Sequence, residues 1–528
     1  MNGQDTPHGR GGADEPGRRG RPGGGPGGGG GGQPHRRRNE AGRERNRGGV
    51  RQYSKSAPSQ RTRAADPARL AAFEVLRAVE RDDAYANLVL PARIRQHRLD
   101  RRGAGFATEL TYGALRGQGL YDAILARCVD RPLDRLDPAV LDALRLGAHQ
   151  LLAMRVPAHA ALDQTVGLAR AVIGAGPASL VNAVLRRVSA RDLAEWTREI
   201  TGSEADPVRR AALVHSHPEW IVRAFRQSLA GHGRSVDELE ALLEADNAAP
   251  VVNLVALPGL GSLDEAFEAG AEPGGLVEDS ALYAGGDVGR LAGVRAGTVR
   301  VQDAGSQLIA RALAAVPLDG SRGAGERWLD LCAGPGGKAA LLGALAARSG
   351  ATLLANEPAG HRAELVRKAL AAVDSKVWEV RAGDGRDLGR LEPGRFDKVL
   401  VDAPCTGLGA LRRRPESRWR RQPADLAQLG PLQRELLESA VDAVRPGGVV
   451  AYVTCSPHPA ETTAVVAGLL RRHKDLELLD SAAALEAASL AGGLQAGRPG
   501  PGTGGTTAQL WPHLHRTDAM FMALLRRK

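Results

Sequence analysis

Apolar side chains recur at helical spacing along the first long stretch of the chain that contains enough of them to build a core. Asp66 followed by Pro67 is typical of a helix N-terminus. Four apolar residues then fall on one helical face: Leu70, Phe73, Leu76 and Val79. The same periodicity, interrupted by Pro, Gly or Asp, predicts further helices over residues 107–116, 138–154, 161–173 and 180–188. We therefore expect an all-helical domain over residues 66–200.

The pattern changes after residue 200. A helical stretch at residues 217–248 precedes two short strand-like runs at residues 251–256 and 298–301, with Gly-rich turns between them. This mixture predicts a small α+β connector domain over residues 201–300.

Strand-like and helix-like segments alternate from residue 327 onward. The predicted strands are residues 328–332, 352–356, 377–381, 396–402 and 449–455. The helices predicted between them are residues 338–348, 362–372 and 426–444. Such alternation is typical of a doubly wound parallel sheet, so we expect a Rossmann-like α/β domain over residues 301–528. Residues 491–507 are rich in Gly and are expected to form a flexible surface insertion before a final strand at residues 521–525.

The positive charge of the chain is concentrated at one end. The 528 residues have a formal net charge of +11, and residues 1–65 contain 14 Arg and Lys against 5 Asp and Glu. This segment also includes a Gly-rich run at residues 22–34 and has almost no apolar residue to bury, so we expect a disordered basic tail. A nonspecific, salt-sensitive RNA tether and a solubilising extension are both open as its role.

Two broad classes of protein are not expected. The sequence contains no run of roughly 18 apolar residues that could form a membrane span, and it contains no signal-peptide pattern. We therefore expect a cytoplasmic protein. The four cysteines are widely spaced, with no C-x-x-C pair and no cluster of His at metal-ligand spacing. Neither a zinc site nor a disulfide framework is therefore expected, and each single cysteine is ordinarily a small buried side chain.

Residues 329–338 are predicted to form a strand that runs into a Gly-rich turn and opens a helix. Such a turn brings backbone N–H groups close to a ligand at a helix N-terminus. Its spacing is neither that of a P-loop nor a full dinucleotide fingerprint, so the turn alone is equally consistent with a tight structural connection. The residues of the turn and the helix start are Cys332, Ala333, Gly334, Pro335, Gly336, Gly337 and Lys338.

An acidic residue follows each of the next three predicted strands: Glu357, Asp384 and Asp402. A carboxylate about twenty residues beyond a Gly-rich turn can hydrogen-bond ribose hydroxyls, so Glu357 is consistent with an adenosine ligand. Because ligands bind at the carboxyl ends of strands in open α/β sheets, the three acids are expected near one ligand. Each of them could alternatively cap a helix.

Two cysteines follow two neighbouring predicted strands, in Pro404-Cys405 and in Thr454-Cys455-Ser456. Two thiols at one rim of the sheet suggest covalent catalysis. A thiolate that adds to carbon 6 of a cytosine makes carbon 5 reactive enough to take a methyl group. The attacking thiol must be favoured as its thiolate, and a second group is useful when the proton on carbon 5 leaves and the thiol is expelled. The residues alone do not choose between Cys405 and Cys455.

An Arg-rich segment follows at residues 411–421, with six arginines and Trp419. A solvated charged loop is the usual interpretation of such a run. Beside two candidate catalytic thiols, we expect instead that it makes phosphate contacts and stacks on a base or ribose of RNA.

With these motifs in place, residues 66–528 resemble the Sun/Fmu (RsmB) family of ribosomal RNA cytosine-5 methyltransferases, within the NOL/NOP/Sun group. Residues 113–116, 157–160 and 182–187 of the helical region resemble the NusB-like RNA-binding domain of that family. Residues 301–307 resemble the segment that leads into its catalytic domain. The basic tail and the insertion lie outside the family pattern.

The resemblance implies a role for each candidate cofactor residue. Residues 332–338 would bind the methionine end of S-adenosylmethionine, Glu357 its ribose and Asp384 its adenine. Asp402 would lie beside the methyl donor and the target base.

The resemblance also assigns the two thiols. The family's nucleophile is the cysteine of the Thr-Cys-Ser segment, here Cys455, and Cys405 would assist product release. DNA cytosine methyltransferases attack instead with the cysteine of a Pro-Cys pair, which would be Cys405.

The sequence therefore predicts a cytoplasmic, monomeric enzyme that methylates carbon 5 of a cytosine in small-subunit (16S) ribosomal RNA, with S-adenosylmethionine and without a metal. The target base is expected to leave its stack to reach the site. One alternative is a transfer RNA or other RNA cytosine-5 methyltransferase with the same chemistry. Another is an RNA-binding assembly or antitermination factor with a vestigial methyltransferase domain. The intact site residues argue against it: Lys338, Asp384, Asp402, Cys405 and Cys455.

Overall fold

A computed structural model describes residues 65–284, 286–320, 325–499 and 505–528. The basic tail predicted at the N-terminus lies outside the described residues, apart from residue 65. Within the described residues, no helix is long and apolar enough to cross a membrane.

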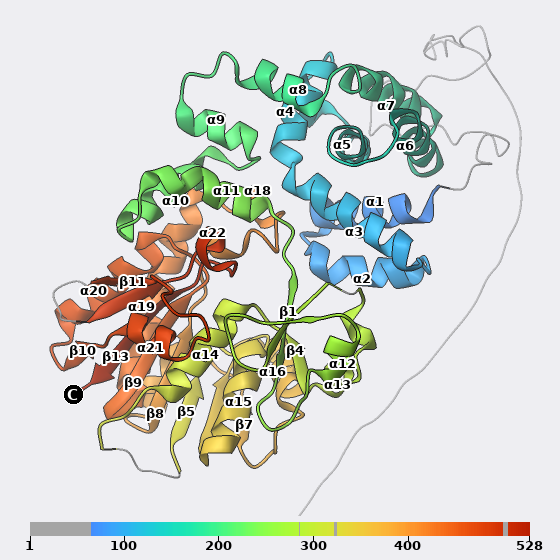
Figure 1. Cartoon of the computed structure of the whole chain (residues 1–528). Helices are drawn as coiled ribbons and strands as arrows, with labels where there is room; N and C mark the ends of the chain where they lie inside the picture. Colours follow the sequence, from blue (N-terminus) through green and yellow to red (C-terminus); the bar gives the residue numbers. More distant parts are fainter. Residues whose placement is uncertain (1–64, 285, 321–324, 500–504) are drawn as a thin grey trace, which may run out of the picture. The chain divides into compact units, whose positions relative to one another are not determined.

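The N-terminal part is helical, as predicted, and its helices follow one another in blue to green in Figure 1. The helix bounds are α1 (Pro67–Asp82), α2 (Ala86–Gln96), α3 (Arg101–Arg116), α4 (Gln118–Cys128), α5 (Pro138–Leu152), α6 (Ala158–Val172), α7 (Ala175–Val188) and α8 (Leu193–Thr201). The predicted cap of α1 is confirmed, because the Asp66 side chain accepts a hydrogen bond from the backbone N–H of Arg69 at 2.9 Å. The apolar faces of these helices share one buried core, in which α5 contributes Leu144 and Leu146.

The next part combines helices with a small antiparallel sheet. Its helices are α9 (Pro207–Val214), α10 (Glu219–Gly231), α11 (Leu239–Asn247), α12 (Asp264–Glu268) and α13 (Ala292–Ala296). Its strands are β1 (Val252–Ala256), β2 (Glu272–Pro273), β3 (Ser280–Tyr283) and β4 (Val299–Val301), in the order β2-β3-β1-β4. The two predicted strands are therefore β1 and β4, which pair with each other in antiparallel register. The domain boundaries at residues 200 and 300 remain predictions.

The C-terminal part is built on a larger sheet. Its strands are β5 (Arg327–Asp330), β6 (Thr352–Asn356), β7 (Trp378–Arg381), β8 (Phe396–Asp402), β9 (Val444–Thr454), β10 (Leu476–Leu478), β11 (Gly497–Pro499), β12 (Thr506–Gln509) and β13 (Phe521–Arg527). The order is β11-β12-β13-β9-β8-β5-β6-β7, with β10 paired to β13. Strands β5 to β9 are parallel to their neighbours in this order, whereas β13 joins β9 in antiparallel register. The predicted doubly wound sheet is thus confirmed in its parallel part from β5 to β9, and the antiparallel strands at one edge make the whole sheet mixed.

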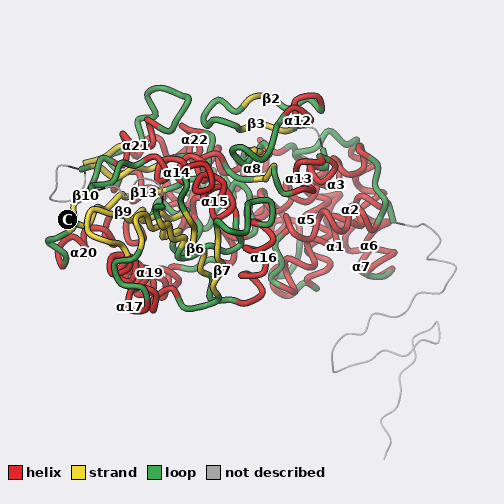
Figure 2. Tube along the Cα trace, turned by 90° about the horizontal axis from the view of Figure 1, so that it is seen from below, coloured by secondary structure: helices red, strands yellow, loops and turns green. Residues whose placement is uncertain are grey.

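Helices cover both faces of this sheet. The helices of this C-terminal part are α14 (Ala304–Ala315), α15 (Gly337–Ser349), α16 (Gly360–Leu370), α17 (Leu388–Leu391), α18 (Ser417–Arg420), α19 (Pro423–Ala443), α20 (Thr463–Arg472), α21 (Ser481–Ala487) and α22 (Pro512–His515). Figure 2 shows the strands between a layer with α14, α15 and α21 and a layer with α17 and α19. Each layer has its own apolar core, since the side chains of alternate strand positions point to opposite faces. The fold is therefore a Rossmann-like α/β domain that follows a helical domain in the sequence.

The predicted insertion at residues 491–507 is more regular than expected. Its described residues include β11 and the start of β12, which pair in antiparallel register. Leu494 and Ala496 are buried in the core beside α14 and α15. The prediction of an insertion confined to the surface is therefore wrong, because these apolar side chains have a core to bury in that the local Gly-rich composition does not reveal.

Candidate active site

The parallel strands bring the predicted site residues to one rim of the sheet. Asp330 at the end of β5 lies in register with Leu400 of β8, and Asp402 at the end of β8 lies in register with Val453 of β9. Asp384 lies three residues after the end of β7. Because parallel pairing places strand ends side by side, residues far apart in the sequence meet at this rim.

The Gly-rich turn packs tightly against the ends of β6 and α16. Gly336 has a φ of 107° at the start of α15, and a Cβ there would lie 2.5 Å from the Cβ of Ala369. A Cβ on Gly334 would lie 2.1 Å from an oxygen of Glu357. Only glycine therefore allows the turn this conformation and this close approach to Glu357.

A buried ion pair stands at the centre of the rim. The Lys338 ammonium lies 2.9 Å from Oδ2 of Asp402, with the lysine side chain 10 % exposed and the aspartate 31 % exposed. Burial by itself lowers the pKa of Lys338, but the Asp402 carboxylate outweighs burial and leaves the pKa above its ordinary value. Lys338 is therefore a permanent cation that holds Asp402 in place.

Asp330 is a residue of this rim that the sequence motifs did not single out. Its side chain is buried, and neither carboxylate oxygen has a hydrogen-bond partner among the described residues. Burial, together with the nearby Asp402, raises the pKa of Asp330 to about 7. Its place at the end of a strand that leads into a Gly-rich turn is the signal that could have identified it.

The unpaired acceptors at the rim fit S-adenosylmethionine. Besides Asp330, Asn356 at the end of β6 has a buried side-chain oxygen with no partner among the described residues. A Cβ on Gly337 would meet no atom within 4 Å, so the N-terminus of α15 is open to a ligand. Carboxylate and amide oxygens accept hydrogen bonds from the ammonium and hydroxyl groups that this cofactor carries.

Two of the predicted cofactor residues are already engaged inside the protein. Glu357 is 2 % exposed, and its Oε1 accepts a hydrogen bond from the backbone N–H of Ala359 at 3.1 Å. The Asp384 carboxylate accepts hydrogen bonds from the side chain and the backbone N–H of Arg386. The Arg386 guanidinium also lowers the pKa of Asp384.

The two cysteines of the rim face each other. The Sγ atoms of Cys405 and Cys455 are 3.4 Å apart, a hydrogen-bonding distance for sulfur. The hydrogen bond from Cys405 lowers the pKa of Cys455, and the Lys338 ammonium adds to this effect. The same hydrogen bond, together with burial, raises the pKa of Cys405 well above its ordinary range. The pair is thus asymmetric, with Cys455 as the more acidic thiol.

The prediction for the Arg-rich segment at residues 411–421 is wrong for its buried arginines. Arg418 is fully buried and donates to the carbonyl of Ser216 at 3.0 Å and to Oδ1 of Asn247 at 2.8 Å. Arg412 is buried and lies 3.1 Å from Oδ2 of Asp303. Both side chains are buried and their terminal nitrogens donate to internal acceptors, so they do not face RNA.

Other side chains of the segment pack on the helical domain. Arg420 donates to main-chain carbonyls at the end of α1, including that of Val79 at 2.8 Å. A Cβ on Gly119 would lie 2.5 Å from the Trp419 ring, so this ring covers α4 and is not free to stack on a base. Arg414 remains exposed, with its guanidinium 4.8 Å from the centre of the Tyr85 ring. The segment mainly joins the helical domain to the rim.

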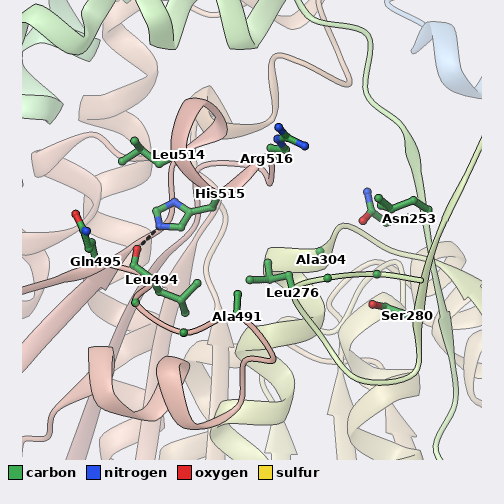
Figure 3. Close-up of a pocket in the computed structure, with 15 residues that line it drawn as sticks. Asn253, Leu276, Ser280, Ala304, Ala491, Leu494, Gln495, Leu514, His515 and Arg516 are labelled. Atoms are coloured by element: carbon green, nitrogen blue, oxygen red, sulfur yellow. Dashed lines mark hydrogen bonds between the residues drawn. The ribbon is translucent and has the colours of Figure 1, made fainter. Parts of the chain in front are cut away.

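A separate pocket of about 560 Å³ lies away from the thiols (Figure 3). Its lining includes Asn253 and Ser280 of the small sheet, Leu494 of the insertion, and His515, which hydrogen-bonds the carbonyl of Leu494 at 2.6 Å. None of the predicted site residues lines this pocket.

The fold and the rim define a Rossmann-like methyltransferase that follows a NusB domain. A family model described as 16S rRNA methyltransferase RsmB/F matches residues 321–526, and the NusB family model matches residues 66–190. A candidate methyltransferase of Mycobacterium tuberculosis is 51% identical over 88% of this chain and 98% of its own. Ribosomal RNA small subunit methyltransferase B of Pseudomonas putida is 34% identical over 78% of this chain and 91% of its own.

The chain therefore belongs to the RsmB/F family of S-adenosylmethionine-dependent methyltransferases. The corresponding protein of Bacillus subtilis, named probable ribosomal RNA small subunit methyltransferase B, is 29% identical over 87% of this chain and 98% of its own. The crystal structure of the protein PH0851 has the same fold, with a TM-score of 0.72 and 22% identity over 88% of this chain and 100% of that one.

Proposed function

We propose that this protein transfers a methyl group to carbon 5 of a cytosine in small-subunit (16S) ribosomal RNA through a covalent bond to Cys455. The observation that carries the proposal is the asymmetric thiol pair beside the Lys338–Asp402 ion pair. The names of the relatives support small-subunit ribosomal RNA as the substrate.

S-adenosylmethionine, when bound, supplies the electrophilic methyl group that carbon 5 receives. Asp330 and Asn356 have free acceptors to hold it, and the turn at residues 332–338 and Glu357 border the same place. Asp384 is exposed, but Arg386 contacts both of its carboxylate oxygens, so Arg386 would have to release one of them for an adenine amino group to bind there. Asp402, held by Lys338, has an exposed edge that can accept a hydrogen bond from the amino group of the target base.

Cys455 is the better nucleophile of the pair because its pKa is the lowered one. Its thiolate forms a bond to carbon 6 of the base, and the displaced electron pair makes carbon 5 nucleophilic. Carbon 5 then gains the methyl group and still carries its proton. Product forms only when this proton leaves, the carbon–sulfur bond breaks and its electron pair returns to Cys455.

Cys405 is suited to the second half of the reaction. Its pKa is raised in the free enzyme in part because a charged Cys455 faces it. Once Cys455 is bound to carbon 6, that negative charge is gone, so Cys405 can release its proton to solvent more readily. The Cys405 thiolate can then accept the proton of carbon 5 while Cys455 leaves. The cycle returns both thiols to their starting states and releases one proton per methyl group.

The test compares wild type, Cys455→Ala and Cys405→Ala, incubated with labelled cofactor and small-subunit ribosomal RNA. We expect Cys455→Ala to lose methylation and covalent RNA, and Cys405→Ala to accumulate a denaturation-resistant adduct that contains RNA. Cys128→Ala is a matched control, because Cys128 is a buried thiol of α4 and should leave both readouts unchanged. Methylation by Cys455→Ala at the wild-type rate would refute the assignment, and methylcytosine mapping identifies the target.

A further inference from the structure

Strand pairing alone does not fix the distance between the two thiols. The last hydrogen bond between the β8 and β9 segments joins the N–H of Ala403 to the carbonyl of Val453 at 2.9 Å. Cys405 lies two residues beyond that bond and Cys455 follows β9, so both thiols are on loops. Two hydrogen bonds join these loops directly, one from the N–H of Gly409 to the carbonyl of Cys455 at 2.9 Å and one between the hydroxyls of Thr406 and Ser456 at 3.3 Å. A further connection holds the residues next to Cys405.

A buried carboxylate makes that connection. Glu461 is fully buried in the short turn Pro459–Glu461, six residues after Cys455. Its Oε1 accepts a hydrogen bond from the backbone N–H of Thr406 at 2.8 Å, and its Oε2 accepts one from the Thr406 hydroxyl at 2.6 Å. Both oxygens thus hold the residue that follows Cys405.

Two further side chains complete the connection. The amide nitrogen Nε2 of Gln433 in α19 donates both to Oε1 of Glu461 at 3.1 Å and to the carbonyl of Pro404 at 2.9 Å. The hydroxyl of Tyr452 in β9 donates to the main-chain carbonyl of Glu461 at 2.8 Å. Glu461 therefore connects the residues on both sides of Cys405 to β9, the strand that Cys455 directly follows.

The charge of Glu461 needs a reason beyond this connection. No ion pair joins Glu461 to a cation within the part of the chain that the structure describes, and its hydrogen-bond donors are neutral. A buried carboxylate without a counter-ion is costly, and a neutral acceptor could serve a purely structural connection. The charge does act on the thiols: after the hydrogen bond to Cys455 and burial, Glu461 is among the groups that raise the pKa of Cys405.

His458, the titratable residue that precedes this turn, carries no charge that acts on Cys405. His458 accepts a hydrogen bond at Nδ1 from the N–H of Ala460, and burial lowers its pKa, so the ring is neutral near pH 7. Besides the Cys455 thiolate, the anionic side chains that act on Cys405 are thus Glu461 and Asp402. Asp402 differs because Lys338 compensates its charge.

We propose that Glu461 is a positioning residue that holds Cys405 as the protonated hydrogen-bond donor to Cys455 and thereby leaves Cys455 free to act as the nucleophile. Glu461 does not touch the substrate in this role. The proposal rests on the two-thiol mechanism above.

The test measures thiol reactivity directly and needs no RNA. The purified full-length protein is alkylated with iodoacetamide between pH 6 and pH 9, and the modified cysteines are quantified by peptide mass spectrometry. In wild type, we expect Cys455 to react at least about tenfold faster than Cys405 at pH 7, which corresponds to about one unit of pKa difference. In Glu461→Gln this ratio should fall about tenfold, because the amide removes the negative charge and keeps only one oxygen to accept hydrogen bonds from Thr406 and Gln433.

Matched variants keep the result interpretable. Thr406→Val removes one donor to Glu461 but keeps the backbone bond, so the ratio should fall about threefold. Glu416→Gln is the control, because Glu416 is also a buried carboxylate that accepts a backbone N–H, that of Ala86, yet lies outside the thiol loops. It should keep the wild-type ratio. If Glu461→Gln does not fold, as judged by its melting curve, the ratio in Thr406→Val decides.

The outcomes separate this proposal from the proposed function. If Glu461→Gln and Thr406→Val keep the wild-type ratio, Glu461 does not set the thiol pair, whether or not wild type traps RNA. If the ratio falls as expected but wild type neither methylates nor traps ribosomal RNA, the role of Glu461 stands and the proposed function fails. A folded Glu461→Gln that traps adduct should show a lower kcat for methylation, with the KM for RNA within about twofold of wild type.

Discussion

The sheet rim and the Arg-rich segment are both dense in charged residues, and the fold uses them in opposite ways. At the rim, parallel strand ends leave Asp330 with two unpaired oxygens and Asp402 with an exposed edge. In the segment at residues 411–421, Arg412 and Arg418 are buried against internal acceptors. The rim therefore keeps hydrogen-bond acceptors free for a ligand, whereas most donors of the segment bind internal acceptors and join two parts of the chain.

The difference shows that the availability of donors and acceptors identifies a site better than charge does. Arg418 is a cation with no exposed surface, and its main partners are Ser216 and Asn247 from the region between the two larger domains. A charged side chain enters the interior only when hydrogen bonds compensate for lost water. The unpaired buried oxygens of Asp330 lie instead at a strand end, where ligands bind in open α/β sheets.

The largest expected effect concerns the rim. Asp402→Asn should lower kcat about 10³-fold, because the amide cannot pair with the buried Lys338 and no longer presents a carboxylate to the base. Steady-state methylation of small-subunit RNA measures this effect. Asp425→Asn weakens an acid–arginine pair of the other region, with Arg421 at 3.6 Å, and should change kcat less than twofold. Equal losses in the two variants would remove the functional distinction between the regions.

The next effect concerns the segment. Arg418→Met should lower the free energy of unfolding by about 3 kcal/mol, because the carbonyl of Ser216 and the side chain of Asn247 lose their buried donor. Urea unfolding followed by circular dichroism measures this change. Arg414→Met removes an exposed guanidinium over Tyr85 and should cost no more than about 1 kcal/mol. Weaker RNA binding by Arg418→Met at unchanged stability would mean that the segment faces RNA after all.

The smallest effect is a pH dependence of stability at the rim. The folded-state pKa of Asp330 is about 7, above the ordinary value of roughly 3.9, so the folded state binds this proton more tightly than the unfolded state. Asp330 therefore reduces stability progressively as the pH rises from about 4 to about 7. Asp330→Asn should nearly match wild type at pH 4 and be about 1–2 kcal/mol more stable at pH 5, while losing affinity for S-adenosylmethionine. Urea unfolding at the two pH values checks the sign, and an equal difference at both values would contradict it.

Much of this arrangement follows from local sequence. The alternation of apolar runs predicted β5, β6, β7 and β8 close to their observed bounds. Strands β5, β6 and β8 are mostly buried and therefore need apolar residues, whereas β7 at the sheet edge is only partly buried. Asp66 and Pro67 marked the start of α1 because a helix N-terminus needs a side-chain acceptor. Chain order then placed Asp402, Cys405 and Cys455 after neighbouring strands, so the meeting of the two thiols was predictable.

Tertiary structure decided what local pattern could not. The antiparallel pairing of β13 with β9 depends on contacts between distant segments, and so does the burial of Leu494 in the core. The burial of Arg412 and Arg418 depends on acceptors more than 100 residues away in the sequence, so the residues around each arginine could not predict it.

The sequence by itself determined which chemical groups reach the rim, because strand order and the two-residue period of a strand fix which residues stand at its end. Only the folded chain decided the protonation and the hydrogen bonds of these groups. Cys405 and Cys455 are the same residue type after neighbouring strands, and they differ because Glu461, Lys338 and Asp402 surround them with unequal charge and hydrogen bonds. Such differences depend on distances of a few ångströms between segments that are separate in the chain, and those distances exist only in the folded protein.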